Sequence, residues 1–243
     1  MPRRILLGFL GCVVFCQATE GRPQRLACSL SVVMFSPTGR MAFDFPDTAA
    51  SPIGTLVERN AAGVGIRGLS ADDVGRHLST QELSARRPGF SQNAIEIDRP
   101  GDASSWRVVW GYTLEESSSC VAGGIVLPED VNRHAYALTI PATASIESVA
   151  LFQLNIRSGA VVSCASWQDL RAIPATQSCE SEAGRISYSI QPYSEPANPA
   201  IKRDRAEVPP ALLEAAQGFR FTCSGQANDS NACRIQIRWK PKP

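Results

Sequence analysis

The C-terminal stretch GFRFTCSGQANDSNACRIQIRWKPKP, residues 218–243, decides the fold class. Two runs in it alternate apolar and polar residues, and each run carries one cysteine. A period of two predicts β-strands, because successive side chains of a strand point to opposite faces. The small polar residues between the two cysteines predict a loop. We therefore predict a β-hairpin whose two cysteines point into a core.

The same alternation divides the side chains of this hairpin between two faces. A row of cations on a flat sheet can bind a sulfated glycan or an acidic protein surface. The alternative is an ordinary solvated face whose charges prevent edge pairing. The predicted core face holds Phe219, Phe221, Cys223, Cys233, Ile235, Ile237 and Trp239, and the predicted outer face holds Arg220, Arg234, Arg238 and Lys240, with Gln236 among them and Lys242 beyond.

The loop of the predicted hairpin contains Asn228-Asp229-Ser230, an acceptor sequence for N-glycosylation. A sugar attached there would need a surface position in a secreted protein, and a loop between two strands provides one. We therefore include Asn228 among the candidate modified residues.

The N-terminus has the pattern of a secretory signal peptide, predicted for residues 1–21. Arg3 and Arg4 precede the apolar run 5–15, and Cys16 and Ala18 provide small residues for cleavage. The run is too short to cross a bilayer, which takes about 20 apolar residues, and no later stretch is apolar enough. We expect a secreted β-rich domain, residues 22–243, located outside the cell or on its surface.

The charge balance argues against two classes of partner. The chain has 24 basic and 23 acidic residues, and cleavage after Ala18 leaves the net charge near −1. No global field therefore attracts nucleic acid or a membrane. A chain of this length can bury a real core, as one large domain or two small ones.

Six cysteines remain after the signal peptide, and an even number in a secreted chain predicts three disulfides. No two of them have the close spacing of a zinc site. From the sequence, Cys223 can pair with Cys233 across a short loop or with a distant cysteine. The six residues are Cys28, Cys120, Cys164, Cys179, Cys223 and Cys233.

Most other segments also predict strands. Residues 28–45 read as a hairpin with a turn at 36–39, and alternating or β-branched runs bounded by Pro, Gly or Ser follow later. The fold class is therefore mostly β, a disulfide-tied β-sandwich with a short helix near the C-terminus. The later runs are 106–114, 134–141, 149–156 and 184–193.

Three segments depart from this pattern. Residues 46–105 contain no cysteine and are expected to form an insertion or a subdomain, with helix starts at Ser70 and Ser79. Residues 194–210 predict a Pro-rich, charged linker. Residues 210–217 predict a short helix, with Pro210 at its start and Gly218 just past its end.

The sequence contains no convincing catalytic or cofactor-binding motif. Residues 63–68 match the dinucleotide-binding pattern of glycines, but the preceding residues are too polar for a buried strand, so a Gly-rich loop is expected. The two histidines, His77 and His134, are not accompanied by a motif that would supply a catalytic nucleophile. Carboxylates adjacent in sequence do not face one cleft. We expect no catalytic residue, no cofactor and no metal.

The C-terminal half resembles the surface-antigen domains of apicomplexan parasites, of the SRS and six-cysteine type. The resemblance lies in Cys120 to Pro128, the strand 136–141 and the two final cysteine-bearing runs. It implies a disulfide-tied β-sandwich on a cell surface that acts in attachment, in some members through sulfated glycans. It also implies nested disulfides: Cys28 with Cys233, Cys120 with Cys223, and Cys164 with Cys179.

The sequence therefore favours a secreted, non-enzymatic binding or surface-antigen protein. Its expected partner is a glycan or protein of a host or cell surface, and a homo-oligomer is possible. A secreted structural component of an envelope, appendage or matrix, using its sheet edges for partners, is the alternative. An enzyme dependent on His77 or His134 is the third class.

Overall fold

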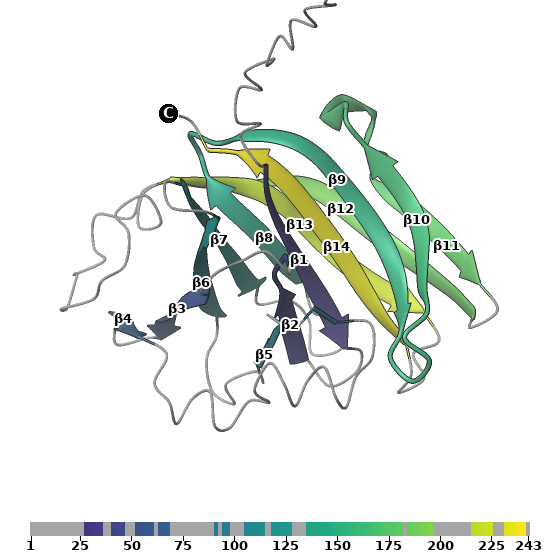
Figure 1. Ribbon diagram of the computed structural model, residues 1–243, viewed down its shortest axis with the longest axis horizontal. Coiled ribbons are helices and arrows are strands. Elements are labelled where there is room, and N and C mark those ends of the chain that lie inside the picture. Colours follow the sequence, from purple (N-terminus) through teal and green to yellow (C-terminus); the bar gives the residue numbers. More distant parts are fainter. Residues whose placement is uncertain are drawn as a thin grey trace, which may run out of the picture.

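The computed structural model shows two antiparallel β-sheets that face each other (Figure 1). Within the described residues, one sheet has six strands and the other has eight. No helix of this part is long and apolar enough to span a membrane. The structure describes residues 27–35, 40–46, 52–60, 63–68, 90–91, 94–97, 105–114, 118–127, 135–181, 184–196, 215–225 and 231–241.

Each sheet mixes strands from distant parts of the chain. The six-stranded sheet has the order β10 (Val161–Trp167), β9 (Ser145–Asn155), β14 (Asn231–Lys240), β1 (Cys28–Phe35), β2 (Arg40–Asp44), β5 (Ile95–Ile97). The eight-stranded sheet has the order β11 (Thr176–Ser181), β12 (Gly184–Glu195), β13 (Ala216–Gly225), β8 (Ala135–Pro141), β7 (Ser118–Leu127), β6 (Ser105–Leu114), β3 (Pro52–Asn60), β4 (Gly63–Gly68).

One apolar core lies between the sheets, and both sheets contribute to it. Leu30 and Trp239 come from the six-stranded sheet, and Tyr188 comes from the eight-stranded sheet. The sheets approach closely: a Cβ atom on Gly124 of β7 would lie 2.7 Å from Cζ of Phe43 on β2. The predicted mostly-β fold is confirmed, as are the hairpin of β1 and β2 and the strands β6, β8, β9 and β12.

The C-terminal ribbon forms its two strands but not the predicted hairpin. Strand β13 pairs with β12 and β8, whereas β14 pairs with β9 and β1 in the opposite sheet. The predicted core face is confirmed, with Phe221 and Ile235 at most 1% exposed. The prediction of a hairpin was wrong. The two strands lie on opposite sides of one core, so their apolar faces both point into it although the strands do not pair with each other. Alternation identifies a buried face but not the sheet to which a strand belongs.

The predicted helix near residues 210–217 is not supported. Ala216 and Gln217 begin β13, where they pair with Pro141 and Ile140 of β8, and residues 210–214 lie outside the described part. Gly218 is needed for close approach rather than for a helix end. A Cβ atom there would lie 1.9 Å from the carbonyl oxygen of Leu138, so only glycine fits this position in the sheet.

Three disulfides join the two sheets, each using one cysteine from either sheet. Their Cα–Cα distances are 5.7 Å for Cys28–Cys120, 5.1 Å for Cys164–Cys179 and 6.4 Å for Cys223–Cys233. The nested pairing is therefore confirmed for Cys164–Cys179 and wrong for the other four cysteines.

The register of the six-stranded sheet explains this correction. Along β1, Cys28 lies opposite Trp239, and Met34 lies opposite Cys233. Cys28 and Cys233 are therefore separated by six residues of strand, about 20 Å. A disulfide needs Cα atoms within about 7 Å. The nested link between them would require a different register.

The cysteine-free segment 46–105 contributes strands to both sheets. Strands β3 and β4 extend the eight-stranded sheet beyond β6, and β5 extends the six-stranded sheet beyond β2. The glycine pattern at residues 63–68 forms β4 rather than a loop. The helix starts predicted at Ser70 and Ser79 lie outside the described residues. Of the predicted linker 194–210, Ser194 and Glu195 belong to β12.

Candidate functional site

The four predicted cations do not form one patch. Arg234, Arg238 and Lys240 lie on β14, and their side chains alternate with buried residues, so they are on the outer face of the six-stranded sheet. Arg220 lies on β13 between the buried Phe219 and Phe221, on the outer face of the other sheet. The hypothesis of a four-residue cluster rested on the hairpin that the chain does not form.

Two of the three cations on β14 are paired with carboxylates. Nη2 of Arg234 lies 2.6 Å from Oδ2 of Asp44, and the side chains are 18% and 3% exposed. Lys240 forms an ion pair with Glu147 of β9, with both side chains partly in solvent. Arg238 is exposed. The outer face is therefore much less positive than a row of unpaired cations would be.

Asp44 is placed by the alternation of β2. Phe43 and Phe45 on either side of it are buried in the core between the sheets, so Asp44 points to the outer face. Its Oδ1 accepts a hydrogen bond of 3.0 Å from the backbone N–H of Ser91. A second, small apolar cluster that includes Ala94 lies on this side of the sheet. Burial of a charge is costly unless it is paired, and Arg234 provides the partner.

More polar groups gather around this ion pair. Nε2 of Gln236 donates to Oγ of Ser29 at 2.9 Å. Oγ of Ser31 and Nε of Arg234 are buried, and neither has a hydrogen-bond partner in the described part of the protein. Cζ of Arg234 lies 5.7 Å from the centre of the Phe152 ring, a cation–π distance.

These residues line a pocket of about 170 Å³ on the outer face of the six-stranded sheet, which we call the Asp44 pocket. It offers hydrogen-bond donors and acceptors side by side, which suits a ligand that carries hydroxyl or amide groups. The lining residues are Ser29, Ser31, Asp44, Phe45, Pro46, Ser91, Arg234 and Gln236.

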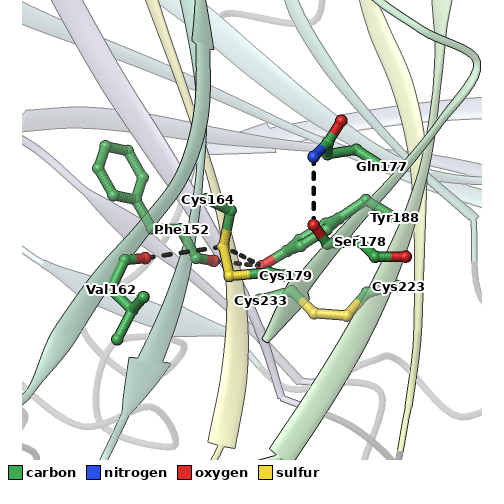
Figure 2. Close-up of a disulfide and its surroundings, with 9 residues drawn as sticks. All are labelled: Phe152, Val162, Cys164, Gln177, Ser178, Cys179, Tyr188, Cys223 and Cys233. Carbon is green, nitrogen blue, oxygen red and sulfur yellow. Dashed lines mark hydrogen bonds between the residues drawn. A yellow bond between two sulfur atoms is a disulfide. The ribbon is translucent and has the colours of Figure 1, made fainter. Parts of the chain in front are cut away.

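A second notable region lies where β10 and β11 form one side of the sandwich. Figure 2 shows the Tyr188 hydroxyl between the Cys164–Cys179 disulfide and the backbone of Phe152. The hydroxyl donates to the carbonyl oxygen of Phe152 at 2.5 Å and lies 3.7 Å from Sγ of Cys164. Burial raises the pKa of the Tyr188 phenol above its ordinary value, so the group stays a neutral donor. It bridges β12 to β9 across the core.

Part of the Asp44 pocket can be inferred from the local sequence pattern. Asp44 stands between two phenylalanines, a position that the period of two assigns to the outer face. Gln236 was correctly placed on the outer face of its strand. The contact of Asp44 with Arg234 was missed, because the two residues are far apart in the sequence and meet only when β1 and β2 join β14 in one sheet.

Several candidates lie outside the described residues: His77, His134, Asn228 and Lys242. Among the side chains that are described, no group of three His, Cys, Asp or Glu residues is placed to hold a metal ion.

Comparisons with protein-family models, with curated proteins and with solved structures found no match to this chain.

Proposed function

We propose that the protein is a secreted, non-enzymatic binding protein whose ligand contacts the Asp44 pocket. The observation that carries the proposal is the ion pair between the buried Asp44 and the partly buried Arg234, which lines a pocket together with Ser31 and Gln236. Buried polar groups normally satisfy their hydrogen bonds, and Oγ of Ser31 and Nε of Arg234 have no partner among the described residues. Ser29, Ser91 and Gln236 line the same pocket and are partly exposed, so a polar ligand can reach their side chains.

The charge pairing favours a neutral, hydroxyl-rich glycan over a densely sulfated one. Sulfate groups are held by several unpaired cations. Here Arg234 and Lys240 already have carboxylate partners. A neutral sugar instead needs alternating donors and acceptors, which the partly exposed side chains of Ser29, Ser91 and Gln236 provide.

The test compares retention of the protein on immobilised neutral oligosaccharides with retention on heparin. We expect binding to neutral glycan, and Gln236→Ala should weaken it about fivefold through the loss of one hydrogen bond. Gln191→Ala is the matched control, because Gln191 is an exposed glutamine on β12 of the opposite sheet. Circular dichroism melting should show that both variants fold like the wild type.

Heparin retention that Arg238→Glu abolishes and Gln236→Ala leaves intact would favour the sulfated-glycan hypothesis and reject the pocket. Arg238 is the appropriate position for a charge reversal, because its side chain is exposed. A carboxylate in place of Arg234 would stand beside the buried Asp44 and unfold the region. Failure to bind either matrix would contradict the proposal.

A structural role in an envelope, appendage or matrix is the second candidate function. The observation that favours it is the uncharged outer edge of the six-stranded sheet at β10, from Val161 to Trp167.

A further inference from the structure

The two sheets end in four edge strands among the described residues, and they differ in how they are protected. Natural edge strands usually carry charge, proline or very short length, because their unpaired backbone groups attract other strands. Strand β11 carries Glu180, β4 carries Arg67, and β5 is three residues long and carries Glu96. Strand β10, with the sequence VVSCASW, has no charged residue and no proline.

The free side of β10 can be assigned from the turn before it. The N–H of Asn155 at the end of β9 bonds to the carbonyl oxygen of Ala160, so the polar backbone groups of Ala160 face β9. These groups alternate in direction along an antiparallel strand. The backbone groups of Val161 and Ser163 therefore point away from β9, to the side where the described residues provide no paired strand.

The side chains at this edge also suit a contact. Val161 is 45% exposed, the exposed large apolar side chain among those described. Ser163 is exposed, and its small hydroxyl group can face another strand without a steric or electrostatic conflict. A bulge between Ser163 and Ala165 is the one feature of β10 that opposes pairing, and it leaves Val161–Ser163 as regular strand.

The edge is held in place before any partner arrives. The disulfide Cys164–Cys179 ties β10 to β11, and the Tyr188 hydroxyl ties β12 to the neighbouring strand β9. A rigid surface loses less conformational entropy on binding. Strand addition at β10 would therefore not first have to order the edge.

We propose that β10 pairs antiparallel with β10 of a second copy of this chain, so that the six-stranded sheets of the two copies become continuous. A two-fold antiparallel pairing places the residues next to the axis close to their own counterparts, so the paired segment must be compatible with a second copy of itself. An uncharged strand meets this requirement, whereas on β11 the exposed Glu180 would approach Glu180 of the copy. The regular part of the edge is short, so the dimer is weak.

Sedimentation velocity of the full chain over a wide range of concentrations tests this. The wild type should shift reversibly from monomer to dimer. Ser163→Lys and Ser163→Glu should each weaken dimerisation about fivefold, because like charges then lie across the two-fold axis. An equimolar mixture of the two variants should recover the dimer, because the charges are then opposite. Ser194→Lys, at an exposed serine of β12, is the control and should change nothing.

Three results would overturn the proposal: a wild type that stays monomeric at every concentration, a Ser163→Lys variant that dimerises like the wild type, or a mixture that does not recover the dimer. The outcome is independent of glycan binding, because Ser163 is not among the residues that line the Asp44 pocket. Circular dichroism melting of Ser163→Lys that matches the wild type would show that the variant is folded.

Discussion

The two faces of β14 have opposite requirements, although they alternate along the same strand. The inner face, with Ile235, Ile237 and Trp239, is at most 1% exposed and packs into the core between the sheets. The outer face carries Arg234, whose partly buried charge is paired with a single carboxylate from β2. The inner face is satisfied by many weak contacts with many neighbours, and the outer face by one specific partner. Substitutions on the two faces should therefore differ in how much they lower the free energy of unfolding, and in whether a second substitution can restore it.

The largest effect is expected on the inner face. Trp239→Ala removes a large, fully buried side chain and should lower the free energy of unfolding by about 3–5 kcal/mol. Lys240→Ala on the outer face, at a partly exposed ion pair, should cost at most about 1 kcal/mol. Urea unfolding followed by tryptophan fluorescence and circular dichroism measures both. Similar losses in the two variants would show that Trp239 is not part of the core.

The next effect tests the outer face. Asp44→Asn leaves the Arg234 guanidinium, whose side chain is only 18% exposed, without its counter-ion and should cost about 3 kcal/mol. The matched change Glu147→Gln, at the more exposed pair with Lys240, should cost at most about 1 kcal/mol.

Repair sharpens this contrast. The double variant Asp44→Asn with Arg234→Met removes both charges and should recover most of the lost stability, because no unpaired charge then remains buried. The same unfolding measurement applies. A double variant as unstable as Asp44→Asn alone would mean that packing, rather than charge, explains the loss.

The smallest effect concerns a polar group on the inner side. Tyr188→Phe removes the hydrogen bond to Phe152 and should cost about 1 kcal/mol at neutral pH. The pKa of Tyr188 is raised in the folded protein, so the unfolded chain releases the phenolic proton first. The stability of the wild type should therefore be unaffected by the ionisation of this group below about pH 10 and should fall by up to about 1.4 kcal/mol per pH unit above it.

Urea midpoints measured from neutral to alkaline pH, under conditions that keep the disulfides intact, check this prediction. Tyr188→Phe should show a shallower alkaline decline than the wild type. Parallel declines in the two proteins would mean that other groups cause the loss of stability and that the Tyr188 proton is not involved.

Much of the fold follows from local pattern. The period of two correctly identified the strands around Cys28, Tyr136 and Ile186 and the buried face of the last two strands. It failed at Ala216 and Gln217, where a run of good helix formers belongs to a strand. Their pairing with β8 and β12 outweighs their intrinsic preference, because tertiary contacts routinely override propensity.

The candidate site was less accessible from the sequence than the fold. Arg234, Arg238 and Lys240 were correctly grouped on one face, because they belong to one strand. Arg220 was grouped with them only by assuming that β13 and β14 pair with each other. Asp44, which neutralises Arg234, could not be found by any local rule, since β1 separates their strands in the sheet.

The sequence by itself determined which segments form strands, which side of β13 and β14 is buried, and that six cysteines are available for disulfides. These properties depend on neighbouring residues and on a period of two. Only the tertiary structure decided that β13 and β14 lie in opposite sheets, that Cys28 pairs with Cys120, and that Asp44 meets Arg234. Such pairings depend on contacts between distant parts of the chain, and one alternation is compatible with many of them.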